Sequence, residues 1–191
     1  MIEFQPKIQK IIELLVYLAE RRPGCDIYQV VKLFYLADRR HFERFGRPIS
    51  FDRYFALPYG PVASIAMDLV NGNAYALREA GIKRLPIDIT FEHRGNQYEA
   101  PVLGMPHREF DRTLFSKSDL SIFDEIIEEY GDKDFDELYN LTHSHLAYKE
   151  AWENRREPGT KRAEMFYEEM IEDDARRTQI SSDINQVAQR M

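Results

Sequence analysis

The sequence predicts a mainly α, α+β fold: a compact helical domain of about six helices with a small β-hairpin packed on it. The 191 residues are enough for one sizeable core but hardly for two domains. Several segments carry apolar residues at helical spacing and are separated by Pro or Gly. One segment, 87–102, alternates weakly about Arg94-Gly95-Asn96, which is the pattern of a β-hairpin.

The first quarter of the chain predicts two helices. Residues 6–21 carry apolar side chains at every third or fourth position, which indicates an amphipathic helix. Asp26 is a suitable N-cap for a second helix that reaches Phe45, where Gly46 can end it. The middle of this second helix, 30–37, is apolar on nearly every side. We therefore expect it to lie at the centre of the core.

The next segment contains three prolines, which exclude a helix before residue 61. Within it, Tyr54–Leu57 is predicted to be a short extended piece. Gly60-Pro61 is expected to open a helix that runs to Val70, because Pro is well tolerated in the first turn of a helix. A break at 71–73 and a short helical continuation over 74–80 should follow.

The second half of the chain predicts two further helices. Ser118 has the character of an N-cap for a helix that reaches Tyr130. Asp134 can begin another helix, which we expect to continue past His145 towards Trp152.

Pro158-Gly159 is a clear break, so we expect a helical domain over 1–157 and a C-terminal helical extension over 158–191. A narrow apolar seam runs along one side of the last predicted helix of the extension. It consists of Ile180, Ile184, Val187 and Met191. A short isolated helix is marginal in water, so the seam either docks on the body or receives a partner, and it also allows a homodimer.

Composition narrows the class of protein. The chain carries 26 basic and 33 acidic residues, a net charge of -7, which disfavours nucleic acid as a partner. Its single cysteine, Cys25, excludes a disulfide framework and a Cys-rich zinc site. Its apolar runs are too short to cross a bilayer, and the N-terminus lacks the pattern of a signal peptide. We therefore expect a cytoplasmic protein with no membrane partner.

Charge is unevenly distributed along the chain. Residues 39–53 are locally basic, whereas 119–137 are strongly acidic. This pattern predicts a molecule with two oppositely charged ends, which suits a protein partner. The candidate partner-binding residues are the exposed arginines and the C-terminal seam: Arg39, Arg40, Arg44, Arg53, Ile180, Ile184, Val187 and Met191. An alternative is a nucleic-acid-binding regulator that acts through Arg39–Arg53.

The sequence offers little catalytic chemistry. Cys25 has no recognisable base, and the phosphate-binding glycine loops are absent. Asp38 and His41 are three residues apart on one predicted helix, and His143 could join them, so a metal-dependent hydrolase is the second alternative. The commoner reading is structural: Asp38 is expected to be partly buried and paired with nearby Arg or Tyr side chains. We therefore predict no metal, no cofactor and no catalytic residue.

Residues 32–38 with His41, then 46–49 and 54–62, resemble the Panacea domain of the SocA-like antitoxin family, also called the phage-associated GepA-like family. The strings YLAD, GRPI and PYGPV occur in order within about thirty residues, and the likeness extends more loosely from Ile8 to Trp152. The motif core consists of Tyr35, Leu36, Asp38, His41, Gly46, Arg47, Pro48, Tyr54, Pro58, Tyr59, Gly60 and Pro61.

This resemblance implies a compact, mostly helical fold with a small β element. It also implies a non-enzymatic antitoxin of a toxin–antitoxin system, whose partner is a cognate toxin protein neutralised by direct contact. Leu57 departs from the family, which often has Met at this position, but the swap conserves volume.

Overall fold

The computed structural model describes residues 4–94, 98–155 and 159–188. Within them, eight α-helices and five short strands confirm the α+β class. The helices are α1 (Ile8–Arg21), α2 (Ile27–Phe45), α3 (Ser64–Val70), α4 (Ala74–Glu79), α5 (Lys117–Tyr130), α6 (Phe135–Ser144), α7 (Leu146–Glu153) and α8 (Asp174–Ala188). The strands are β1 (Tyr54–Leu57), β2 (Gly60–Ala63), β3 (Ile87–Arg94), β4 (Tyr98–Pro106) and β5 (Ala163–Met165). None of the helices in these described ranges is long and apolar enough to cross a membrane.

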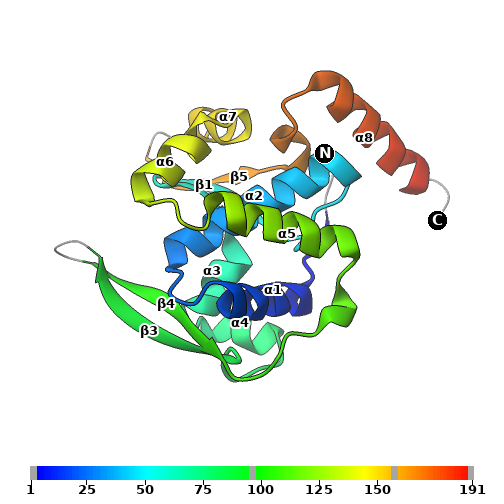
Figure 1. The fold of residues 1–191 in the computed structure, drawn as a ribbon. Coiled ribbons are helices and arrows are strands. Elements are labelled where there is room, and N and C mark those ends of the chain that lie inside the picture. Colours follow the sequence, from blue (N-terminus) through cyan, green and yellow to red (C-terminus); the bar gives the residue numbers. More distant parts are fainter. Residues whose placement is uncertain (1–3, 95–97, 156–158, 189–191) are drawn as a thin grey trace.

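Helix α2 is the centre of the core, as its apolar sequence predicts. Its N-cap Asp26 forms a capping box with Gln29, and Gly46 ends it in the left-handed conformation, with φ of 70°. Helices α3, α5 and α6 and strand β2 all contact α2. Figure 1 shows α5 in front of α2, α1 below it and the three-stranded sheet above it. This arrangement buries α2 on most sides.

The predicted helix at Gly60-Pro61 was wrong in its first four residues. Gly60–Ala63 is strand β2, which pairs antiparallel with β1, so that Tyr54 lies opposite Ala63 and Leu57 opposite Gly60. Helix α3 begins only at Ser64. The local pattern gave the wrong element because proline is tolerated in an extended strand as well as in the first turn of a helix. The hairpin turn before it decides between the two.

Two helix boundaries also differ from the prediction. Ser116, not Ser118, caps α5, because Ser116 and Asp119 form a reciprocal capping box. The expected helix from Asp134 to Trp152 is divided into α6 and α7 at His145, whose ψ of 135° is extended. The division at His145 gives seven helices in the described part of 1–157 where about six were predicted, and α8 in the extension is the eighth.

The predicted hairpin is confirmed as β3 and β4, which pair antiparallel from Ile87 and Pro106 to Arg94 and Tyr98. Its turn, 95–97, lies outside the described residues. Figure 1 shows the hairpin projecting from the body at the opposite end from α8. Strand β4 of this hairpin packs on α1.

Strand β5 was not predicted. It adds to the free edge of β1, with Tyr54 opposite Met165, and completes a sheet of order β2-β1-β5. A 3-10 turn over Tyr167–Met170 follows and leads into α8. The extension therefore supplies part of the sheet that lies on α2.

The structure describes the side chains of two of the four residues of the C-terminal seam. Ile180 is buried beside Gly46, and Ile184 packs on the core. Val187 lies in α8, but its side chain and the whole of Met191 lie outside what the structure describes. The described part of the seam thus docks on the body.

Candidate functional site

The carboxylate of Asp38 lies at the centre of the family motif and is almost fully buried. Oδ1 accepts the backbone N–H groups of Ile49 and Ser50, each at 2.8 Å. Oδ2 accepts the hydroxyls of Ser50 and Tyr54, the latter at 2.9 Å, and lies 3.1 Å from the hydroxyl of Tyr167. Burial raises the pKa of Asp38, although these donors favour the charged form. Every oxygen of this carboxylate is engaged within the fold.

A second buried carboxylate, Asp52, holds the start of α3. Oδ1 accepts the backbone N–H of Ile65, and Oδ2 accepts that of Ala66, both at 2.9 Å. Helix α3 has no side-chain cap of its own, so Asp52 takes the place of an N-cap from outside the helix. Burial raises the pKa of Asp52 to about 7.

His41 belongs to a different network, which joins α1, α2 and α5. Its Nδ1 lies 2.7 Å from the carbonyl oxygen of Arg47, and its Nε2 lies 3.1 Å from Oδ1 of Asp119. The buried Asp119 also pairs with Nζ of Lys10 at 2.8 Å and Nη2 of Arg47 at 2.7 Å. Burial opposes ionisation of Asp119, but hydrogen bonds from His41 and Lys10 hold its pKa well below the usual range.

The proposed metal set of Asp38, His41 and His143 is not assembled. His143 lies on α6, where its Nδ1 is 2.8 Å from the carbonyl oxygen of Tyr139 and its Nε2 is 3.3 Å from that of Pro58. Across the described parts of the chain, no three His, Cys, Asp or Glu side chains form a group that could hold a metal ion. In the described residues, the three side chains put forward for the metal-dependent hydrolase therefore do not form a shared site.

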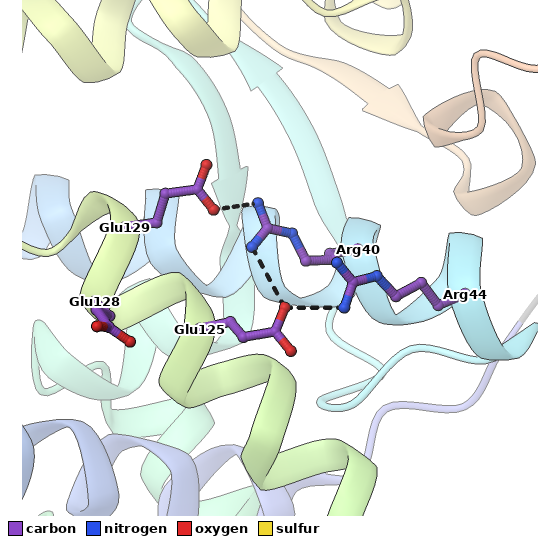
Figure 2. Close-up of a pocket in the computed structure, with 5 residues that line it drawn as sticks. All are labelled: Arg40, Arg44, Glu125, Glu128 and Glu129. Atoms are coloured by element: carbon purple, nitrogen blue, oxygen red, sulfur yellow. Dashed lines mark hydrogen bonds and ion pairs between the residues drawn. The ribbon is translucent and has the colours of Figure 1, made fainter.

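The basic and acidic segments pair with each other. Figure 2 shows Arg40 and Arg44 of α2 reaching towards the glutamates of α5. Arg40 binds Glu129 at 2.6 Å, and Arg44 binds Glu125 at 2.9 Å. The expectation of two separate charged ends was wrong, because α2 and α5 lie side by side and bring the two segments together.

The remaining candidate arginines behave differently from one another. Arg39 donates through Nε to the carbonyl oxygen of Met170 at 3.1 Å and pairs with Glu172, so it binds the C-terminal segment. Arg53 is exposed, and its side chain has no partner among the residues that the structure describes. Of the arginines put forward as contacts, Arg53 is therefore the one whose charge the fold leaves uncompensated.

A buried lysine lies beneath the β1–β2 turn. Nζ of Lys32 donates to the carbonyl oxygen of Pro61 at 2.8 Å, and burial lowers its pKa well below the ordinary value. Gly60 approaches it closely: a Cβ there would lie 2.7 Å from Nζ of Lys32 and 3.0 Å from Oγ1 of Thr142. The confined space at this turn therefore requires glycine. Sequence reasoning missed this role, although a lysine within the apolar stretch 30–37 was a signal for it.

Aromatic rings line the surface where this turn meets α6. The aromatic face consists of Tyr28, Tyr59, Phe135, Tyr139 and His143. Phe135 lies 4.5 Å from Tyr28 and 5.8 Å from Tyr139, measured between ring centroids. Tyr59 and Phe135 are 65% and 47% exposed. Sequence reasoning missed this face as well; its signal was the four-residue spacing of 135, 139 and 143.

Comparison with known proteins identifies the family. The family model described as "Antitoxin SocA-like, Panacea domain" matches residues 30–153. This range includes α2 from its fourth residue onward, the β1–β2 turn, the Asp38 and Asp52 carboxylates and all of α6. No curated protein and no solved structure matches the chain. The match supports a role in a toxin–antitoxin system, and the chain belongs to the SocA-like antitoxin family that carries the Panacea domain.

Proposed function

We propose that this protein is a non-enzymatic antitoxin that acts in the cytoplasm and neutralises a cognate toxin protein by direct binding. Membership of the SocA-like family supports the toxin partner. The proposal that the protein is not an enzyme rests on one observation: the polar groups of the motif form hydrogen bonds within the core. Asp38 and His41 are the acid and the imidazole of the motif, and both are engaged in hydrogen bonds within the core.

A catalytic acid or base must reach the proton that it transfers, within hydrogen-bond distance or through one water. Asp38 is 1% exposed and His41 is fully buried. Both are surrounded by donors and acceptors from their own chain, which gives each a structural role instead. The buried polar groups of the motif therefore build the fold and leave recognition to surface residues.

The alternative of a nucleic-acid-binding regulator receives less support. Phosphate binding needs cationic side chains that are free to neutralise the backbone. In this chain Arg40 and Arg44 are paired with glutamates of α5, and Arg39 is paired with Glu172. Arg53 remains a candidate contact, but one arginine without an acidic partner among the described residues makes a weak electrostatic footprint.

The test is co-expression with the product of the adjacent reading frame, with each gene under its own inducible promoter. We expect this protein to restore growth and to co-purify with the toxin through an affinity tag. Direct binding also predicts that purified antitoxin inhibits the toxin fully only near equimolar amounts, and that the mass of the toxin is unchanged. Complete inhibition at a small fraction of the toxin concentration, or no relief of toxicity at equal abundance, would overturn the proposal.

A further inference from the structure

The aromatic face is formed by residues from separate parts of the chain. Tyr28 comes from α2, Tyr59 from the β1–β2 turn, and Phe135 with Tyr139 from α6. The ring of Phe135 lies between those of Tyr28 and Tyr59, with centroids at 4.5 Å and 6.1 Å. Figure 1 shows α6 next to the end of the hairpin that β1 and β2 form. Three elements thus present their rings at one place on the surface.

Two large rings of this face are exposed, and the other three are half-buried. Tyr59 is 65% exposed and Phe135 is 47% exposed, while neighbouring rings continue the stack inward to His143, 3.6 Å from Tyr139. Aromatic side chains that are rigid and already packed lose little entropy when a partner covers them. They dominate the centres of protein interfaces for that reason.

The charges around the face are mostly negative. Asp134 and Asp136 flank Phe135 in the sequence and are exposed, whereas Asp132 is paired with Arg22 at 2.6 Å. The nearby cation Lys133 is paired with Glu137 at 3.1 Å. An acidic rim favours an incoming cation and disfavours a phosphate backbone.

The rings of this region already contact basic side chains within the chain. Nζ of Lys32 lies 4.7 Å from the centroid of Tyr28. Further along the same stack of rings, the guanidinium of Arg155 lies 4.4 Å from the centroid of Trp152. Aromatic faces attract cations through their quadrupole, and the planar guanidinium of arginine stacks on them best. The exposed rings of Tyr59 and Phe135 offer the same chemistry to a partner.

We propose that the aromatic face is the surface on which the toxin docks, and that the exposed rings of Tyr59 and Phe135 receive an arginine side chain presented by the toxin. This inference rests on the proposed function and adds the location and the chemistry of the contact. It moves the main contact away from the arginine-rich segment of α2, whose charges are compensated within the chain.

The test uses single variants of the full chain, assayed for binding to the co-expressed toxin and for growth rescue at matched abundance. Tyr59→Ala and Asp136→Lys change an exposed ring and the acidic rim, and Phe135→Ala changes the central ring. Tyr75→Ala and Phe91→Ala are the matched controls, because these rings are 63% and 61% exposed elsewhere on the surface. A denaturation midpoint for each variant shows whether it is folded.

We expect Tyr59→Ala and Phe135→Ala each to weaken toxin binding at least about tenfold, and Asp136→Lys to weaken it and slow association. The control variants should bind as the unchanged protein does. Folded Tyr59→Ala and Asp136→Lys proteins that bind with unchanged affinity would overturn this inference and leave the proposed function standing. Failure of the unchanged protein to bind the toxin would instead overturn the proposed function, and this inference with it.

Discussion

The hydroxyl of Tyr167 lies 3.1 Å from Oδ2 of Asp38, which joins the 3-10 turn after β5 to the middle of α2. The same hydroxyl lies 2.7 Å from the backbone carbonyl oxygen of Asp52. The family match ends at residue 153, so the C-terminal extension supplies a hydrogen bond to a motif that lies 129 residues earlier. In this chain the C-terminal extension therefore contributes hydrogen bonds to the buried centre of the domain.

Tyr167→Phe should lower the free energy of unfolding by about 1–3 kcal/mol, because it removes a buried hydroxyl that lies within hydrogen-bond distance of the Asp38 carboxylate and the Asp52 carbonyl oxygen. Tyr28→Phe is the matched control. The hydroxyl of Tyr28 is buried and has no partner among the described residues, so its removal should leave stability unchanged or slightly raise it. Urea denaturation of the three proteins gives the comparison. Equal losses in the two variants would show that the Tyr167 hydrogen bond contributes nothing specific.

Two C-terminal deletions should separate the roles of β5 and α8. Deletion of 160–191 removes β5 and the buried side chains of Met165, Tyr167 and Met170. It should cost at least about 4 kcal/mol of stability, since each buried side chain contributes roughly 1.5–3 kcal/mol. Deletion of 174–191 removes α8 with its buried side chain Ile180. It should lower the free energy of unfolding by about 2 kcal/mol.

Thermal and urea denaturation measure both deletions, and growth rescue at matched abundance measures their effect on the toxin. The longer deletion should weaken rescue through loss of the fold. Full rescue by the chain without 160–191 would remove the extension from the mechanism altogether. Equal stability of the two truncated proteins would contradict a structural role for β5.

The stability contributed by Asp52 should depend on pH. Burial raises the pKa of Asp52 to about 7, above the ordinary value of 3.8, so the folded state holds this proton more tightly than the unfolded state. The contribution is therefore fully present below about pH 4 and is lost as the pH rises through about 7. Asp52→Asn, which cannot titrate, lacks this dependence.

The difference in unfolding free energy between the unchanged protein and Asp52→Asn should fall by roughly 2–4 kcal/mol between pH 4 and pH 8. Urea denaturation at several pH values measures it. The subtraction cancels His145, whose pKa burial lowers to about 4 and whose effect on stability has the opposite sign. A difference that stays constant over this range would show that Asp52 is ionised in the fold at every pH tested.

Gly60→Ala should destabilise the protein by about 2–4 kcal/mol. Gly60 has a φ of +100°, and its added Cβ would lie 2.7 Å from Nζ of Lys32. Gly72→Ala is the matched control, because Gly72 also has a positive φ, +69°, but has no atom within 4 Å of an added Cβ. It should cost about 1 kcal/mol from backbone strain alone. If denaturation gives the same loss for both, the close approach of Lys32 carries no energetic weight.

Local pattern was a reliable guide where an element is defined by its own residues. Helix α2 follows from the apolar stretch 30–37 with Asp26 at its start and Gly46 at its end. The β3–β4 hairpin follows from alternation on both sides of a turn. The same reasoning failed at Gly60–Ala63 and at β5, because a strand of three or four residues depends on its partner strand for its hydrogen bonds.

Only some residues of the candidate site could be predicted from the local sequence pattern. The buried acid was expected at Asp38, but its distant partner Tyr167 was not, because no local spacing relates residues 129 positions apart. Arg40 and Arg44 read as a free basic surface until α5 placed Glu125 and Glu129 against them.

Periodicity, caps and turn residues act over a few neighbouring positions, so the helical class, the central helix and the family motif follow from the amino-acid sequence alone. The packing of distant elements establishes which charges cancel, which carboxylates are buried and which aromatic rings from α2, the β1–β2 turn and α6 meet at one surface. Those outcomes depend on packing between elements far apart in the chain, and burial and Coulomb energy are properties of the assembled fold.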